Sequence, residues 1–191
     1  ALLNLIENIF SWEISSPLTV KDLSIRLSKR LKKYDKKGEE HYNLISALHK
    51  SIRGSDPDAA LYWLARILDG GEDPRFIARR LLRMALEDVG LADPQAQSIC
   101  LHAWQSFERL GSPEGELALA QAALYLALAP KSNASYKGFN LSLDLVKKTG
   151  SEPPPKHILN APTDLMKDQG YGAGYEYDHD SADGFSGQNY F

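Results

Sequence analysis

Apolar residues recur at spacings of three and four along most of this chain, which is the period of an amphipathic helix. Pro, Asp, Ser or Asn precedes most of these apolar runs and Gly follows many of them, as helix starts and stops require. Strand-like alternation is absent, and no pattern returns at a fixed period of 33 to 45 residues. We therefore expect an all-α fold with an irregular arrangement of helices, at 1–10, 19–33, 40–52, 57–69, 74–89, 94–110, 113–129 and about 133–148.

A sharp helical corner is predicted between the third and fourth of these helices. Gly54 can adopt the left-handed conformation that ends the first helix, while Ser55 or Asp56 can cap the N–H groups of the second. Pro57 fits the first turn of a helix, where its missing N–H has no partner to lose. The corner predicts that these two helices pack against each other.

One predicted helix is apolar on nearly every face. Residues 117–129 contain mainly Leu and Ala, which predicts a helix surrounded by protein on all sides. It can be an ordinary core helix, or part of its surface can lie in a subunit interface that its small alanines allow to approach closely. The interface candidates, including two tail residues, are Leu117, Leu124, Tyr125, Leu128, Tyr171 and Tyr175.

The chain changes character after Gly150. Pro153, Pro154 and Pro155 predict a stiff extended connector, and a short helix is predicted at 163–168. The remaining segment is rich in Gly and Tyr and cannot form a core alone. Disordered tails are usually poor in aromatic residues, so we weigh an extended arm in a groove of its own or a neighbouring subunit against simple flexibility.

Length and composition limit the class of protein. With 191 residues, 43% of them hydrophobic, and a formal net charge of −3, the chain can bury a core in one or two small domains. No run of about 18 apolar residues occurs, and no signal peptide is indicated, so we expect a cytoplasmic protein without a membrane segment. The single cysteine, Cys100, lies among apolar residues and is expected to pack as a small hydrophobe.

Basic residues gather in two places that could meet a phosphate backbone. Residues 21–37 contain eight Lys and Arg against two Asp. In a helix, four of these lie at spacings of three and four, and a second cluster follows later in the chain. The alternative for both is a solvated face or internal pairing with acids such as Glu72, Asp73, Glu87 and Asp88. The DNA-binding candidates are Arg26, Lys29, Arg30 and Lys33, then Arg75, Arg79, Arg80 and Arg83.

No group of residues predicts an active site. Gly170, Gly172 and Gly174 form a G-x-G-x-G sequence, but neither a strand before it nor a helix after it supports phosphate binding. The five histidines lack the spacing of metal ligands, and no nucleophile elbow G-x-S-x-G occurs. We therefore expect no catalytic, cofactor or metal residue in this chain.

Blocks of distinctive residues run along nearly the whole chain. They include Ser55-Asp56-Pro57-Asp58-Ala59-Ala60, Glu87-Asp88-Val89-Gly90 and Ala129-Pro130-Lys131-Ser132-Asn133-Ala134. Further blocks lie at 34–48, 73–81, 113–121, 160–167 and 170–172. Together they resemble the RarA/MgsA replication-associated recombination AAA+ ATPases, relatives of the clamp loaders and of the eukaryotic Werner-helicase-interacting protein.

The resemblance implies a C-terminal fragment, because the phosphate-binding loop G-x-x-x-x-G-K-[ST] of that family is absent from the chain. It implies the remainder of an AAA+ helical lid at 1–38, a clamp-loader-like helical collar for oligomerisation at 39–150, and a Pro-rich connector with tail at 151–191.

The full-length parent would be a DNA-dependent ATPase that uses ATP and Mg²⁺. It would act as a homotetramer in replication, recombination and repair at stalled forks or single-strand gaps. Its partners would be single-strand/double-strand DNA junctions, single-stranded-DNA-binding protein and the replisome, in the cytoplasm near the nucleoid. The alternative is a free-standing helical adaptor for proteins, with no nucleotide or DNA role.

Overall fold

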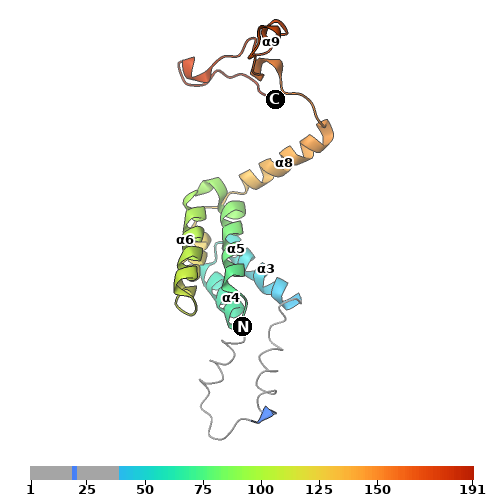
Figure 1. Ribbon diagram of the computed structural model, residues 1–191. Helices are drawn as coiled ribbons and strands as arrows, with labels where there is room; N and C mark the ends of the chain where they lie inside the picture. Colours follow the sequence, from blue (N-terminus) through green and yellow to red (C-terminus); the bar gives the residue numbers. More distant parts are fainter. Residues whose placement is uncertain (1–18, 21–38) are drawn as a thin grey trace. The chain divides into compact units, whose positions relative to one another are not determined.

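The computed structural model describes residues 19–20 and 39–191, and this described part contains helices and turns without a β-strand (Figure 1). The all-α prediction is confirmed, whereas the predicted helices at 1–10 and 19–33 lie essentially outside the described residues. The long helices are α3 (Glu39–Arg53), α4 (Pro57–Asp69), α5 (Pro74–Met84), α6 (Gln95–Leu110), α7 (Glu116–Leu128) and α8 (Ala134–Thr149). The short ones are η1 (Ala85–Val89), η2 (Gly90–Ala92), η3 (Lys156–Ile158), α9 (Asp164–Asp168) and η4 (Asp178–Asp180).

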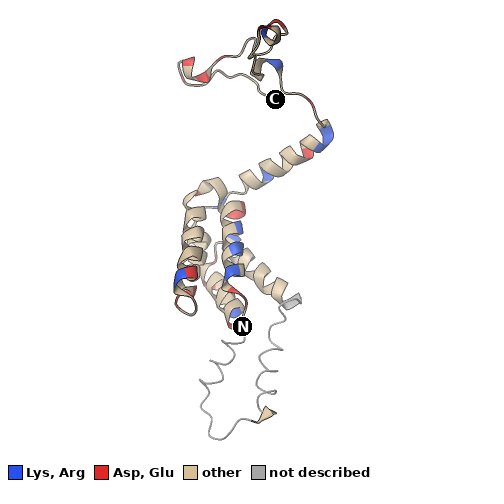
Figure 2. Cartoon of the chain, viewed as in Figure 1, with Lys and Arg blue, Asp and Glu red and all other residues tan. Residues whose placement is uncertain are grey.

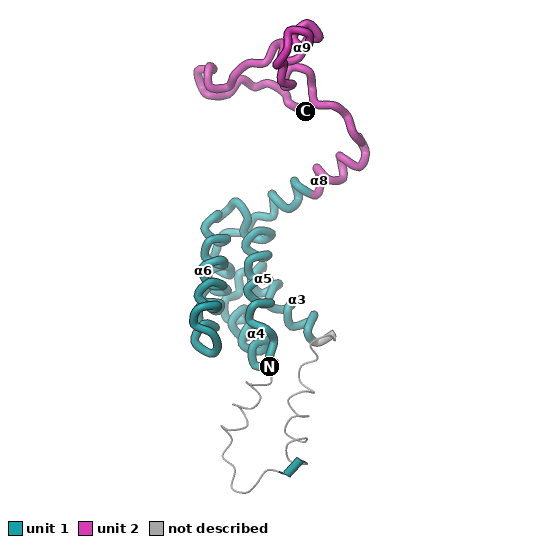
Figure 3. Tube along the Cα trace, viewed as in Figure 1, with its two compact units in different colours: residues 1–139 teal, residues 140–191 magenta. Residues whose placement is uncertain are grey.

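The chain divides into two compact units, residues 1–139 and 140–191, and the division falls inside α8 (Figure 3). In the first unit α7 is central, since it contacts α3, α4, α5 and α6. Burial of each large apolar side chain contributes about 1.5–3 kcal/mol to folding. The core residues include Leu48, Ile52, Leu64, Ile67, Ile77, Leu81, Met84, Leu119 and Leu126.

Cys100 is buried in this core, as predicted. Burial raises the pKa of its thiol to about 12, because the thiolate would lose its hydration there. The thiol therefore stays protonated and packs as an apolar group.

The chain changes direction between α3 and α4 one residue later than predicted. Gly54 continues the helix, with its N–H donating to the Lys50 carbonyl, and Ser55 adopts the left-handed conformation with φ 59°. The Asp56 N–H then donates to the Ser51 carbonyl, which is the bond pattern of a Schellman ending. The prediction for Gly54 was wrong, because a glycine that keeps its helical hydrogen bond leaves the reversal to the next residue.

The starts of α4 and α5 use the same capping chemistry. The Asp56 carboxylate accepts from the Ala59 N–H at 2.9 Å, and Pro57 follows in the first turn. Asp73 caps α5 in the same way, again followed by a proline, Pro74. Of the two predicted caps for α4, the structure therefore uses Asp56.

The predicted helix at 74–89 changes its winding near its end. α5 ends at Met84 and continues as the π-helical segment η1, in which the wider turn accommodates an additional residue. The Asp88 carbonyl accepts a hydrogen bond from the Ser132 N–H at 2.8 Å, outside the helix. Gly90 follows with φ 53°, and a Cβ at this position would lie 2.7 Å from the Ser132 carbonyl oxygen. The prediction of one regular helix was wrong here, because the chain after α7 approaches this turn too closely.

One face of α7 is open. The helix begins at 116 rather than at 113, after a turn in which a Cβ on Gly115 would lie 2.8 Å from the Phe107 Cα. Leu117 and Leu128 are 76% and 71% exposed, whereas Leu119 on the opposite side is fully buried. The ordinary core-helix alternative was wrong, because within the described residues α3 to α6 cover one side of α7, and the subunit-interface alternative stays a prediction.

α8 differs from the bundle helices, since all of its described side chains are exposed or intermediate in burial. It begins where the Ser132 hydroxyl oxygen accepts from the Ala134 N–H at 3.3 Å. Neither α8 nor any other described helix is long and apolar enough to cross a membrane.

The second unit is held by hydrogen bonds within the tail. The Gly172 N–H donates to the Lys156 carbonyl at 2.9 Å. Asp178 accepts from the N–H and hydroxyl of Ser186, and from the hydroxyl of Tyr190. The short helix predicted at 163–168 is confirmed as α9, but these tail contacts were not predicted.

Candidate functional site

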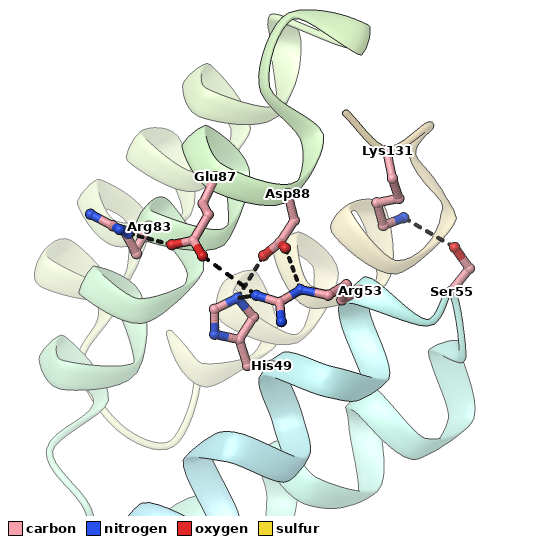
Figure 4. Close-up of polar contacts among 7 residues, drawn as sticks. All are labelled: His49, Arg53, Ser55, Arg83, Glu87, Asp88 and Lys131. Atoms are coloured by element: carbon pink, nitrogen blue, oxygen red, sulfur yellow. Dashed lines mark hydrogen bonds and ion pairs between the residues drawn. The ribbon is translucent and has the colours of Figure 1, made fainter. Parts of the chain in front are cut away.

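A polar cluster lies where α3, η1 and the loop after α7 meet (Figure 4). Its centre is Asp88, whose side chain is 4% exposed. The Asp88 carboxylate oxygens lie 2.5 Å from Nε2 of His49 and 2.5 Å from Nε of Arg53. Because an ionised carboxylate can only accept, His49 donates its Nε2 proton to it. The hydrogen bond to Asp88 also raises the pKa of Arg53, so this guanidinium stays charged.

Glu87 connects this cluster to α5. Nε of Arg83 donates to Glu87 at 2.7 Å, one helical turn away, and Nη2 of Arg53 reaches the other carboxylate oxygen at 3.5 Å. The Arg83 guanidinium also lies over the Tyr136 ring, 5.6 Å from its centroid. Through these contacts, α3, α5 and the first turn of α8 share one network.

Lys131, in the loop after α7, lies beside this network. Its Nζ donates to the carbonyls of Ala127 at 2.9 Å and Ala129 at 2.5 Å, which are among the open acceptors at the end of α7. The same Nζ lies 3.2 Å from the hydroxyl of Ser55 at the α3–α4 corner. Desolvation lowers the pKa of Lys131, opposed by the charge of Asp88. The three quoted blocks at 55–60, 87–90 and 129–134 therefore meet in space.

An open depression of about 660 Å³ lies beside this network. Ligand atoms of His49, Glu87 and Asp88 lie within 4.8 Å of one another, which is a spacing that a metal ion could use. However, Arg53 and Arg83 already donate to these carboxylates, and the His49 Nε2 proton faces Asp88. These side chains already pair with one another, so the cluster gives no reason to propose a bound metal ion.

Of the four arginines of α5 in the second predicted basic cluster, three lie on the protein surface and one is partly buried. Figure 2 shows Lys and Arg positions in blue along α5. Three of these residues, Arg75, Arg79 and Arg83, are exposed and lie at intervals of four residues. Arg75 binds Glu108 through two nitrogens at 2.8 and 3.1 Å, which lowers the pKa of Glu108. Arg80 is turned inward, and within the described chain its buried Nε has no hydrogen-bond partner.

Internal pairing, the predicted alternative to DNA contact, thus occurs for Arg75 and Arg83. Arg79 lies over the Phe76 ring, 5.8 Å from its centroid, and remains exposed. The first basic cluster, Arg26, Lys29, Arg30 and Lys33, lies outside the described residues. DNA contact by either cluster remains a prediction.

The predicted interface residues of α7 separate into two groups. Leu117, Leu124 and Leu128 follow one another at helical spacing on the open face, with Leu124 the least exposed. Tyr125 instead donates its hydroxyl to Asp93 at 2.6 Å, and this bond to a carboxylate raises the pKa of Tyr125. The leucines are therefore free to meet a partner, whereas Tyr125 is anchored within the chain.

α8 adds a second exposed apolar surface. Four of its apolar residues follow one another at spacings of three, four and three, as along the contact line of two packed helices: Tyr136, Phe139, Leu143 and Val146. Two further leucines, Leu141 and Leu145, lie on the other side of the helix. The six residues are Tyr136, Phe139, Leu141, Leu143, Leu145 and Val146, between 37% and 70% exposed.

The two tail candidates lie in the second unit. Tyr171 is intermediate in burial, while Tyr175 is 45% exposed and borders a pocket within that unit. Their place in a subunit contact remains a prediction.

Sequence reasoning missed Asp88 as the centre of a network. Its partners His49 and Arg53 lie 39 and 35 residues earlier in the chain. One signal was present, since an acid beside Val89 on the apolar face of a helix needs a buried partner.

Comparison with known families supports the resemblance predicted from the sequence. Residues 54–191 match the family described as "MgsA AAA+ ATPase C terminal", and residues 1–53 match the "AAA C-terminal domain" family. The join between these matches falls at the α3–α4 corner.

Several curated proteins are similar over most of the chain. Replication-associated recombination protein A of Coxiella burnetii is 56% identical over 188 residues, covering 96% of this chain and 43% of that protein. The Escherichia coli K12 protein of the same name is 52% identical, covering 85% of this chain and 37% of that protein. ATPase WRNIP1 of Dictyostelium discoideum is 46% identical, covering 85% of this chain and 18% of that protein.

The chain thus spans less than half the length of the curated relatives that it matches. The matched family covers more than half of the chain, and the sequence blocks that suggested it include those that meet around Asp88. The chain belongs to the MgsA AAA+ ATPase C-terminal family, whose relatives include the bacterial replication-associated recombination proteins.

Proposed function

We propose that this chain holds together the subunits of a replication-associated recombination AAA+ ATPase and contributes to its contact with DNA. The observation that carries the proposal is the exposed apolar surface of α7 and α8 in a chain of this family. The parent protein would bind and hydrolyse ATP with Mg²⁺ through a part that this chain does not contain. This chain itself would hydrolyse nothing.

Self-association follows from the cost of leaving these side chains in water. Leu117, Leu128 and Leu141 are each at least 70% exposed, and Phe139 is 65% exposed. Each such side chain gains about 1.5–3 kcal/mol when a partner buries it fully. Exposed clusters of large apolar side chains, as on α7 and on α8, mark interaction sites on soluble proteins. We propose a second copy of this chain as the partner, and four copies in the complete assembly.

Mass measurement in solution tests this assembly. We expect native mass spectrometry and light scattering to show a tetramer whose stability depends on Leu128 and Phe139. Leu128→Asp and Phe139→Asp should each shift the chain toward monomer, because a carboxylate would have to be buried without a partner. Leu91→Asp is the matched control, since Leu91 is 78% exposed but lies on η2. A wild-type monomer, or equal dissociation in all three variants, would contradict the proposal.

DNA contact is the second part of the proposal, and the exposed arginines of α5 support it together with the basic segment 21–37. Because the described residues contain no zinc finger or base-reading motif, binding should follow the shape or strand state of the DNA. In the parent, this contact would favour single-strand/double-strand junctions. Single-stranded-DNA-binding protein and the replisome would be its neighbours there.

Salt dependence distinguishes phosphate contact from a solvated basic face. Replacing Arg26, Lys29, Arg30 and Lys33 with Gln should weaken binding to a labelled forked DNA, measured by fluorescence anisotropy. Each lost phosphate contact should reduce the slope of log K against log salt by about 0.7–0.9. Gln at Arg75, Arg79 and Arg83 should have a smaller effect, since Glu108 and Glu87 already pair with two of them. Unchanged affinity and slope in both variants would remove DNA from the proposal.

A further inference from the structure

The second unit contains an aromatic pocket that the proposed function does not use. The pocket has a volume of about 490 Å³ and is bordered by the rings of His157, Tyr175 and Tyr190. The His157 and Tyr190 rings are nearly parallel, at 27°, with centroids 6.2 Å apart. Gly172 and Leu159 complete one wall, where a Cβ on Gly172 would lie 3.4 Å from the Leu159 carbonyl oxygen. Three aromatic rings are therefore available to a ligand in this pocket.

The unit that contains the pocket is rich in acids. Residues 151–191 contain seven Asp and Glu against two Lys. Both lysines are engaged within the unit, because Lys156 donates to the Gln169 carbonyl at 3.2 Å and Lys167 pairs with Asp164 at 3.2 Å. An anionic ligand would therefore be repelled, whereas a cation would be attracted to the unit and to the ring faces.

One acid of this unit, Asp178, is hydrogen-bonded to a ring that borders the pocket. Tyr190 donates its hydroxyl to Asp178 at 2.9 Å, and Ser186 donates to the same carboxylate through its N–H at 2.9 Å and its hydroxyl at 2.7 Å. These three bonds hold the carboxylate beside the Tyr190 ring. A phenol that donates to a carboxylate has a more electron-rich ring, which strengthens its attraction for a cation.

We propose that this pocket binds a lysine or arginine side chain from the basic segment 21–37 of a second copy of this chain. That segment carries eight Lys and Arg against two Asp, so its charge is complementary to residues 151–191. The choice of a second copy rests on the proposed self-association. Exposed aromatic rings can also stack on nucleobases, but the excess of acids in residues 151–191 disfavours a phosphate backbone.

A labelled peptide with the sequence of residues 21–37 provides a direct probe. Fluorescence anisotropy would measure its binding to the full chain and to a chain with Gln in place of all eight Lys and Arg of residues 21–37, in which no competing basic segment remains. We expect salt-sensitive binding to at least one of the two, and none for a peptide with Gln in place of every Lys and Arg. Tyr190→Leu and Tyr175→Leu should each weaken binding about fivefold to tenfold, the range expected for loss of one cation–π contact.

Phe185→Leu is the matched control, because Phe185 is an aromatic residue of the same unit, 75% exposed and outside the pocket. Its affinity for the peptide should equal that of the unsubstituted chain. Leu128→Asp should also bind the peptide normally, so failure of the pocket and failure of self-association give different results. Absence of peptide binding to both chains, or equal affinity in the Tyr175, Tyr190 and Phe185 variants, would overturn the proposal. So would binding of a labelled oligo(dT) that is lost with Tyr175→Leu.

Discussion

α7 and α8 both contain several large apolar residues but have very different surroundings. α7 contacts four other helices and buries Leu119, Ala122, Ala123, Leu126 and Ala127 on one side. α8 buries none of its residues among those that the structure describes, although Phe139, Leu141 and Val146 are as apolar as the residues of α7. Apolar content therefore indicates that a helix has side chains to bury, but it does not say whether the same chain or a partner buries them.

The comparison also applies to polar contacts. Asp88 in the bundle is almost completely buried and binds two side chains from α3. Asp144 in α8 pairs with Lys147 at 3.1 Å, but its side chain is 63% exposed. Since water competes with exposed pairs, the first carboxylate should stabilise the fold much more than the second.

The two faces of α7 provide the largest expected difference. Leu126→Ala should lower the free energy of unfolding by about 3 kcal/mol, because it removes a fully buried side chain and leaves a cavity. Leu128→Ala, two residues later and 71% exposed, should change that free energy by less than about 0.5 kcal/mol. Urea unfolding of both variants at low protein concentration measures the difference. Equal effects would show that the open face of α7 is covered in the folded monomer.

The buried carboxylate provides the next largest effect. Asp88→Asn should lower the free energy of unfolding by about 2 kcal/mol, since it weakens charge-assisted hydrogen bonds to Arg53 and His49. Asp144→Asn in α8 is the control, and its effect should remain below about 0.5 kcal/mol. Thermal and urea unfolding would test both. A harmless Asp88→Asn substitution would mean that the network contributes geometry without stability.

The starts of α4 and α8 should differ by a smaller amount. Asp56→Ala should cost about 1 kcal/mol, because the carboxylate accepts from the Ala59 N–H at 2.9 Å. Ser132→Ala should cost about 0.5 kcal/mol or less, since its bond to the Ala134 N–H is longer, at 3.3 Å. Circular dichroism during urea unfolding would follow both variants. The reverse order would indicate that α8 is more firmly held than its exposure suggests.

The smallest expected effect concerns pH and the second unit. Hydrogen bonds from Ser186 and Tyr190 lower the pKa of Asp178 below its ordinary value of 3.8. A carboxyl group with a lowered folded-state pKa stabilises the fold above its unfolded pKa and loses this contribution as pH falls through the lowered value. Acidification below about pH 4 should therefore shift the NMR signals of Tyr190 and Ser186. Asp178→Asn should remove this shift, and a persistent shift would assign it to another group.

The helix positions could be predicted because their causes are local. The Pro and Asp residues that begin α4 and α5 act on the next few residues, and apolar spacing identifies the face to be buried. Even here, details of the chain path depended on distant contacts. The π-helical turn of η1 forms where the Asp88 carbonyl bonds to the Ser132 N–H, 44 residues later in the chain.

The functional surfaces were less predictable. The α5 arginines were found by spacing, but spacing could not show that Glu108 would pair with Arg75 from 33 residues away. The leucines of α7 were named as interface candidates, but their spacing could not decide whether this face is covered within the chain. A periodic pattern reports how apolar a side of a helix is, and exposure depends on what else the chain places there.

The sequence by itself determined the all-α class, the capped corners and the family, because local hydrogen bonding, helical period and residue identity are properties of short segments. Tertiary structure alone decided that His49, Arg53, Glu87 and Asp88 form one network, and that α7 and α8 leave apolar residues uncovered. The physical reason is that ion pairing and burial depend on distances between segments far apart in the chain, which no local pattern records.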